Sequence, residues 1–92
     1  MTTMTTDLRP LIFANLQAQI RHAVTNLMIR RYRQGVFLEE IALKLDTSPS
    51  AILELISGKK EFTERSLAEM VWALDGEIAI ELRPWELFDA PS

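Results

Sequence analysis

The sequence predicts a mainly α-helical domain that ends in one β-strand. Apolar residues recur at steps of three and four from Phe13 to Leu27, which is the period of a helix. The same period returns in shorter runs over residues 38–75. Only residues 77–83 change to strict alternation, the period of a strand. The fold class is therefore all-α apart from this last segment.

Composition indicates one globular domain over residues 1–92. The hydrophobic share of 48% and the charged share of 25% are ordinary for such a domain. Cysteine is absent, which excludes disulfides and thiolate metal sites. The first ten residues lack the basic region and apolar core of a secretion signal, and no apolar run approaches the ~20 residues of a membrane span. We expect a cytoplasmic protein with no membrane partner.

The charge is unevenly distributed along the chain. The net charge is −3, which counts mildly against a nucleic-acid partner. Residues 1–34 nevertheless carry five arginines and one aspartate, whereas residues 35–92 carry five basic and twelve acidic residues. Because local patches decide where phosphates dock, the basic first third keeps this partner open.

Residues 10–34 read as one long helix. Thr6 or Asp7 is placed to cap it and Pro10 lies in its first turn. Its length of about 37 Å, at 1.5 Å per residue, leaves residues 10–19 as an N-terminal extension with an apolar stripe of its own. That stripe packs either on the protein's own core or on a partner helix from a second subunit or a cognate protein.

Residues 38–57 predict two short helices joined by a tight turn. Asp46 stands at the corner, where a left-handed residue is needed, and Ser48 offers an N-cap before Pro49 at the first helical position. Ala42 lets the two helices approach closely. Four apolar residues face inward at helical spacing: Ile41, Leu45, Ile52 and Leu55.

Three stretches resemble the phage-repressor-like (Cro/XRE) helix-turn-helix family: GVFLEEIA at 35–42, SPSAI at 48–52 and SGKK at 57–60. The resemblance continues through Phe62-Thr63, Leu67 and Ala73-Leu74 and covers roughly residues 27–84. It implies a domain of four to five helices that binds operator DNA as a dimer. Members of this family act as repressors or as antitoxins of toxin–antitoxin pairs.

Three positions depart from the family pattern. Leu38 replaces a glutamine that typically contacts a phosphate, and Phe37 replaces a Ser or Thr N-cap. Leu53 replaces a serine that is common on the recognition helix. The first and third weaken the inference of DNA binding and leave the fold inference intact.

The resemblance places a DNA-reading stripe on the second helix of the motif. Ser50 can bond a phosphate or a base edge, Leu53 can lie against a thymine methyl, and Glu54 can accept from cytosine N4. The loop lysines and the arginines that end the long helix would bind phosphates. The predicted DNA-binding residues are Arg31, Arg33, Ser48, Pro49, Ser50, Leu53, Glu54, Ser57, Lys59 and Lys60.

Each of these assignments has a structural alternative. Cations favour a helix C-terminus, which accounts for arginines at the end of the long helix. Lys59 and Lys60 can simply solubilise a surface loop. The outward stripe of the second motif helix can be a solvated face, with Leu53 contacting another protein.

The last elements predict a core helix, a strand and a tail. Thr63 caps a helix over residues 63–75, and Pro84 stops the strand over 77–83. A lone strand needs a partner, which is its copy across a two-fold axis, residues 85–90 or the N-terminal segment. The residues expected at this dimer contact are Ile78, Ile80 and Leu82.

The tail over residues 85–92 is acidic with three large apolar residues. It either folds back over the core or serves as a short linear motif for another protein. A cognate protein, a toxin among the possibilities, would bind through residues 10–19 or 85–90.

No catalytic or metal-binding set emerges. His22 is the single histidine and has no cysteine or carboxylate cluster beside it, so we expect no enzyme activity, metal or cofactor. The leading hypothesis is a sequence-specific transcriptional regulator acting as a dimer on double-stranded operator DNA. The alternative is a protein-interaction module that keeps the helix-turn-helix fold without reading DNA.

Overall fold

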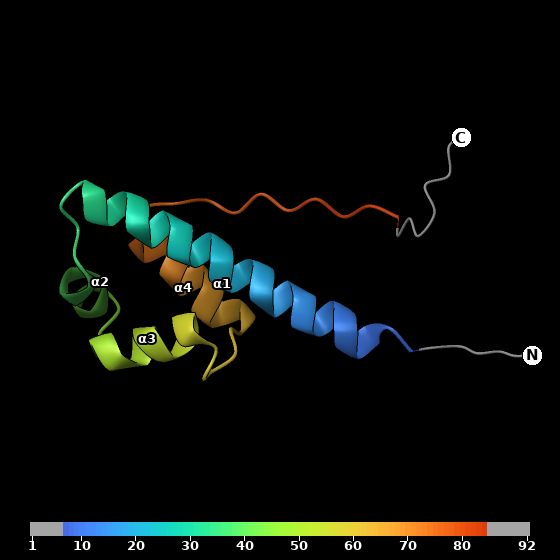
Figure 1. Cartoon of the computed structure of the whole chain (residues 1–92). Coiled ribbons are helices and arrows are strands. Elements are labelled where there is room, and N and C mark those ends of the chain that lie inside the picture. Colours follow the sequence, from blue (N-terminus) through green and yellow to red (C-terminus); the bar gives the residue numbers. More distant parts are fainter. Residues whose placement is uncertain (1–6, 85–92) are drawn as a thin grey trace, which may run out of the picture.

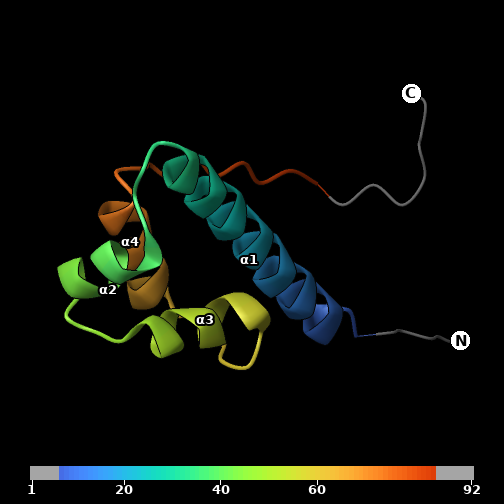
Figure 2. The same cartoon turned by 60° about the vertical axis from the view of Figure 1, so that its left-hand side comes forward.

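The computed structural model describes residues 7–84, and the described part contains four helices (Figure 1). They are α1 (Arg9–Arg33), α2 (Leu38–Lys44), α3 (Pro49–Ser57) and α4 (Glu64–Ala73). The long α1 forms one side of the molecule, and the three short helices gather against its C-terminal half (Figures 1 and 2). The expected all-α core with a long first helix is confirmed.

Leu8 is the N-cap of α1 and makes no side-chain cap, and Asp7 before it bonds the first residue of the helix. The Asp7 carboxylate accepts hydrogen bonds from the backbone N–H of Arg9 at 3.1 Å and from the Arg9 guanidinium at 2.9 and 2.8 Å. These bonds hold the pKa of the Asp7 carboxyl below its ordinary value. Pro10 lies in the first turn, as the sequence predicts, whereas Thr6 is outside the described residues.

One hydrophobic core joins the four helices. The buried apolar residues are Val24, Ile41, Ala42, Ile52, Phe62, Met70, Ala73 and Leu74. Of the predicted inward residues, Ile41 and Ile52 are fully buried, and Leu45 and Leu55 are half-buried against the same cluster. Ala42 is also buried, as expected for a small residue that lets two helices approach.

The turns follow the predicted capping chemistry. Asp46 adopts a left-handed φ of 55°, and the Ser48 hydroxyl accepts a hydrogen bond from the N–H of Ala51 at 3.2 Å. At the start of α4, the Thr63 hydroxyl accepts from the N–H of Ser66, and the Ser66 hydroxyl accepts from the N–H of Thr63. These caps fix both ends of the connection between α2 and α3 and the entry to α4.

The predicted strand does not form in the single chain. Residues 77–83 are extended and exposed, and no strand is assigned within residues 7–84. The physical reason is that a strand needs a neighbour for its backbone N–H and C=O groups, and the described chain places none beside this segment. Residues 85–92, the predicted tail, lie outside the described residues.

None of the helices in the described part of the chain is both long and apolar enough to cross a bilayer.

Candidate nucleic-acid interface

The outward face of α3 is the first part of the candidate site. Its inner side carries the buried Ile52 and, three residues on, the half-buried Leu55. The predicted stripe is indeed exposed as a set: Ser50, Leu53, Glu54 and Ser57. Pro49, at the first position of the helix, is half-buried and serves the helix start.

The hydroxyl groups along this stripe are not equally available. Ser48 uses its oxygen to cap α3, and the Ser57 hydroxyl donates to the carbonyl of Glu54 at 3.3 Å. The Ser57 oxygen also accepts from the N–H of Lys59 at 3.5 Å. Ser50 has no hydrogen bond of this kind within residues 7–84, so it is the serine best placed for an external contact.

The loop after α3 presents two lysines. Gly58 ends the helix with a left-handed φ of 86°, and the N–H of Lys60 donates back to the carbonyl of Glu54 at 3.0 Å. The loop is thereby folded onto the C-terminal end of α3. Lys59 and Lys60 are exposed, and neither ammonium group lies within ion-pair distance of a carboxylate in the described part.

Arg21 of α1 joins this loop, which the sequence did not predict. A Cβ atom added to Gly58 would lie 3.5 Å from Nε of Arg21, so the guanidinium lies against the backbone where α3 ends. The group Arg21, Lys59 and Lys60 is called the α3 basic cluster below. No local motif marks Arg21; the one available signal is Gly58, whose missing side chain leaves room for a neighbour.

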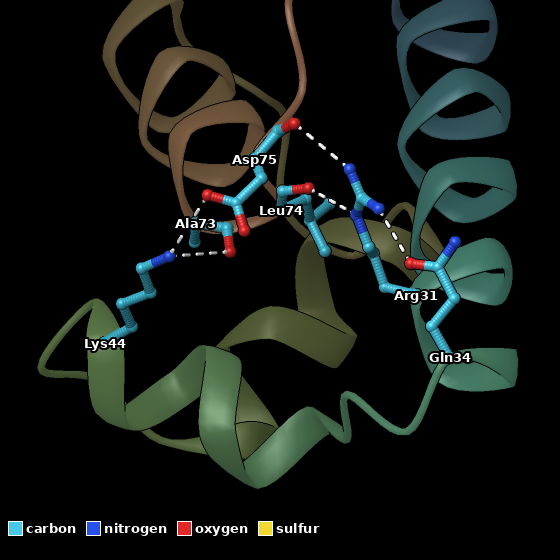
Figure 3. A network of polar contacts seen from close by, with 6 residues as sticks. All are labelled: Arg31, Gln34, Lys44, Ala73, Leu74 and Asp75. Carbon is cyan, nitrogen blue, oxygen red and sulfur yellow. Dashed lines mark hydrogen bonds and ion pairs between the residues drawn. The ribbon is translucent and has the colours of Figure 1, made fainter.

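The guanidinium of Arg31, one of the predicted DNA-binding residues, bonds groups of its own chain. Its Nε donates to the carbonyl of Leu74 at 2.7 Å, and its Nη2 donates to the carbonyl of Asp75 at 3.1 Å (Figure 3). Its Nη1 donates to the Gln34 side chain at 2.7 Å. The guanidinium therefore caps the end of α4, which is the helix-terminus role of such cations. Arg33 is exposed.

Lys44 approaches the same helix end from α2. Its ammonium group lies 3.4 Å from the carbonyl of Ala73 and 3.6 Å from the Asp75 carboxylate (Figure 3). It also lies 5.0 Å from the centre of the Trp72 ring. Lys44 and Arg31 together tie α2 and α1 to the last turn of α4.

Gln17, like Arg21, makes a contact with a distant segment that the sequence did not predict. Its side-chain amide donates to the carbonyl of Phe62 and accepts from the N–H of Phe62, both at 2.8 Å. Gln17 is buried and so is Phe62, so these bonds satisfy backbone groups that water cannot reach. Gln17 occupies the core-facing row between Phe13 and Val24, and a polar residue in that row was the signal to notice.

The entry to α2 carries negative charge. Glu39 and Glu40 lie in its first turn, where the helix dipole favours them. The Glu40 carboxylate accepts from the N–H of Phe37 at 3.0 Å and so supplies the cap that the Phe37 side chain cannot provide. The start of α2 is therefore negatively charged, whereas the loop after α3 carries Lys59 and Lys60.

Within residues 7–84, no three histidine, cysteine, aspartate or glutamate side chains gather in a way that could hold a metal ion. Comparison with models of known protein families, with curated proteins and with solved structures returns no match.

Proposed function

We propose that this protein is a sequence-specific DNA-binding transcriptional regulator, of the repressor or antitoxin type, that binds operator DNA as a dimer. α3 would enter the major groove with its outward stripe, while α2 crosses above it. The observation that carries the proposal is the α3 basic cluster: three cations, free of carboxylate partners in the described part, lie at the end of α3, whose outer face is exposed.

The division of labour follows from the side chains available. Phosphate contacts position a protein on DNA, whereas base contacts specify the sequence. Lys59, Lys60 and Arg21 supply positive charge for the phosphates. Ser50, Leu53 and Glu54 supply base contacts, but none of these is the bidentate Arg, Asn or Gln that discriminates purines best. We therefore expect binding dominated by phosphates, with modest sequence preference and strong salt dependence.

Dimerisation belongs to the same proposal. A helix-turn-helix dimer spans two half-sites about one helical turn apart, which multiplies a weak single contact. Residues 77–83 offer the unpaired segment through which two copies would associate.

The test is fluorescence anisotropy with labelled duplex DNA of mixed sequence over a salt series. The proposal expects affinity that falls with rising salt, and a smaller salt slope when Lys59 and Lys60 are both replaced by alanine. Absence of binding at low salt would refute the proposal.

A second function has its own observation. Leu43 of α2, Leu53 of α3 and Trp72 of α4 are large apolar side chains exposed to water. Such residues suit a protein partner. A protein-interaction module that keeps this fold predicts no DNA binding at any salt concentration, so the anisotropy measurement separates the two functions.

A further inference from the structure

An apolar row on the N-terminal half of α1 is left uncovered by its own chain. Ile12, Phe13 and Leu16 are each about half exposed, at 50%, 48% and 51%. The row continues through Ile20 to Leu27 at helical spacing, and these two residues pack against the core. The N-terminal half thus continues, exposed to solvent, the row that Ile20 and Leu27 pack against the core.

The C-terminal segment leaves the domain on this face. Gly76 lies so close to Leu27 that an added Cβ would be 2.7 Å from Cδ2 of that leucine. From there the chain runs toward the side of the molecule where the N-terminal end of α1 lies (Figures 1 and 2). The exposed fraction rises along the segment, from 48% at Ile78 to 76% at Ile80 and 90% at Leu82. The segment starts on the row and then leaves it uncovered.

The sequence of residues 77–83 is complementary to itself. In an antiparallel pair centred on Ile80, Glu77 lies opposite Arg83 and Ile78 lies opposite Leu82. The opposite charges then meet on one face of the ribbon, and the apolar residues meet on the other.

Neighbouring registers lose this match. Centring the pair on Ala79 sets Glu77 opposite Glu81, and centring it on Glu81 sets two copies of Glu81 opposite each other. Like charges directly opposite destabilise a pair. Centring the pair between two residues shifts the register by one residue. This sets apolar residues opposite polar ones, because side chains alternate with a period of two. One register is therefore preferred by charge and by side-chain alternation together.

We propose that residues 77–83 of two copies pair antiparallel around Ile80, and that the apolar face of this ribbon covers the row Ile12, Phe13 and Leu16 on α1. A two-stranded ribbon alone is marginal in water and needs a helix to cover its apolar face. In the proposed dimer the row on α1 covers the apolar face of the ribbon, and the ribbon covers the exposed side chains of the row. This inference rests on the proposed dimer and specifies which surfaces form it.

The lengths of the two elements agree. From Leu27 back to Leu16, α1 rises about 16 Å at 1.5 Å per residue. From Gly76 to Leu82, an extended strand covers about 20 Å at 3.3 Å per residue. The strand therefore reaches Leu16 and Phe13 when it runs antiparallel to α1. A single strand on this row would leave its backbone groups unpaired, whereas the second copy satisfies them.

The absence of cysteine in the sequence gives a direct test of the register. In the proposed ribbon Ile80 faces its own copy, at a Cα separation that a disulfide can span. Ile80→Cys is expected to form disulfide-linked dimers on mild oxidation. Glu77→Cys, whose copy lies at the far end of the ribbon, is the matched control and is expected to remain monomeric on denaturing gels. Cross-linking of Glu77→Cys but not of Ile80→Cys would overturn the register.

The contact between the ribbon and the row on α1 is tested by light scattering over a concentration series. Leu16→Asp is expected to raise the dimer dissociation constant roughly tenfold or more, because a leucine that the ribbon covers in the proposed dimer is replaced by a charge. Leu11→Asp is the matched control, since Leu11 is similarly exposed, at 58%, but lies on the other flank of α1. Its dissociation constant should equal that of the wild type.

The possible outcomes are distinct. Equal dimer dissociation constants for Leu16→Asp and Leu11→Asp would overturn the contact between the ribbon and the row on α1. A wild type that stays monomeric at every concentration would overturn the whole inference. In that second case residues 77–83 of the same chain or another protein would cover the row. Both experiments are done without DNA and with circular dichroism to confirm folding, so their failure is separate from loss of DNA binding in the anisotropy measurement.

Discussion

Two groups of cations illustrate how differently the fold uses the same kind of side chain. At the end of α4, the guanidinium of Arg31 and the ammonium group of Lys44 contact backbone carbonyls of residues 73–75. At the end of α3, the α3 basic cluster has no carboxylate partner in the described part of the chain. The first group holds the helices together, and the second is available to a ligand.

The difference teaches that a basic run is not in itself a binding site. Arg31 stands in the most basic stretch of the chain, yet it is committed to the domain's own backbone. Arg21 stands among polar and apolar residues, yet it reaches the loop where Lys59 and Lys60 are found. Substitutions at Gln17, at Lys59 with Lys60, at Arg31 and at Arg21 test this division.

Removing the amide of Gln17, which bonds the backbone of Phe62 two residues after Lys60, should have the largest effect. Gln17→Ala leaves the buried N–H and C=O of Phe62 without partners, which should lower the free energy of unfolding by about 2–4 kcal/mol. Chemical denaturation measures this change. Gln19→Ala, an exposed neighbour on α1, is the control and should stay within about 0.5 kcal/mol of the wild type. A wild-type stability for Gln17→Ala would contradict the role of this amide.

Removing charge from the α3 basic cluster should affect DNA binding and leave stability unchanged. The double variant Lys59→Ala/Lys60→Ala should lose roughly tenfold to thirtyfold in affinity and about two units of salt slope. The control Arg30→Ala/Arg65→Ala removes the same charge from exposed sites elsewhere. An equal loss for both variants would show that overall charge, and not the cluster, governs binding.

Removing Arg31, the guanidinium at the end of α4, should lower stability and leave DNA binding unchanged. Arg31→Ala should lower the free energy of unfolding by about 1–2 kcal/mol, because it deletes hydrogen bonds to the carbonyls of Leu74 and Asp75. Arg33→Ala, two residues on and exposed, should be near neutral. If Arg31→Ala weakened DNA binding at concentrations where the protein is fully folded, the assignment of Arg31 to the domain interior would be wrong.

Removing Arg21 should have the smallest effect. One cation of the three is lost, so Arg21→Ala should weaken DNA binding by roughly threefold to fivefold and lower the salt slope by about one. Anisotropy at two salt concentrations is enough to measure both values. Arg21→Lys should restore most of the affinity, since it returns the charge to the same place. An unaltered slope in Arg21→Ala would exclude Arg21 from the cluster.

The sequence was sufficient for the elements and their turns. The inward position of Ile41 and Ile52 follows from local spacing, and the left-handed turn at Asp46 and the caps at Ser48 and Thr63 follow from local chemistry. Each of these depends on residues within about one helical turn. The boundaries of the helices were predictable for the same reason.

The sequence was insufficient where a side chain satisfies a distant backbone group. Gln17 and Phe62 are 45 residues apart, and Arg31 and Leu74 are 43 apart. No periodicity marks such pairs, because the acceptor is a carbonyl common to every residue. The strand over residues 77–83 does not form in the single chain for a related reason: alternation describes which side chains share a face but does not supply a neighbouring strand.

The central claim, that DNA lies on α3 and on the loop that follows it, is tested most directly by NMR. Uniformly labelled protein is titrated with duplex DNA, and the shifts of the backbone amides are mapped on the chain. We expect the largest shifts on residues 48–60 and beside Arg21, with small shifts around Arg31 and Leu74. Shifts concentrated at the end of α4, or no shifts at low salt, would contradict this claim.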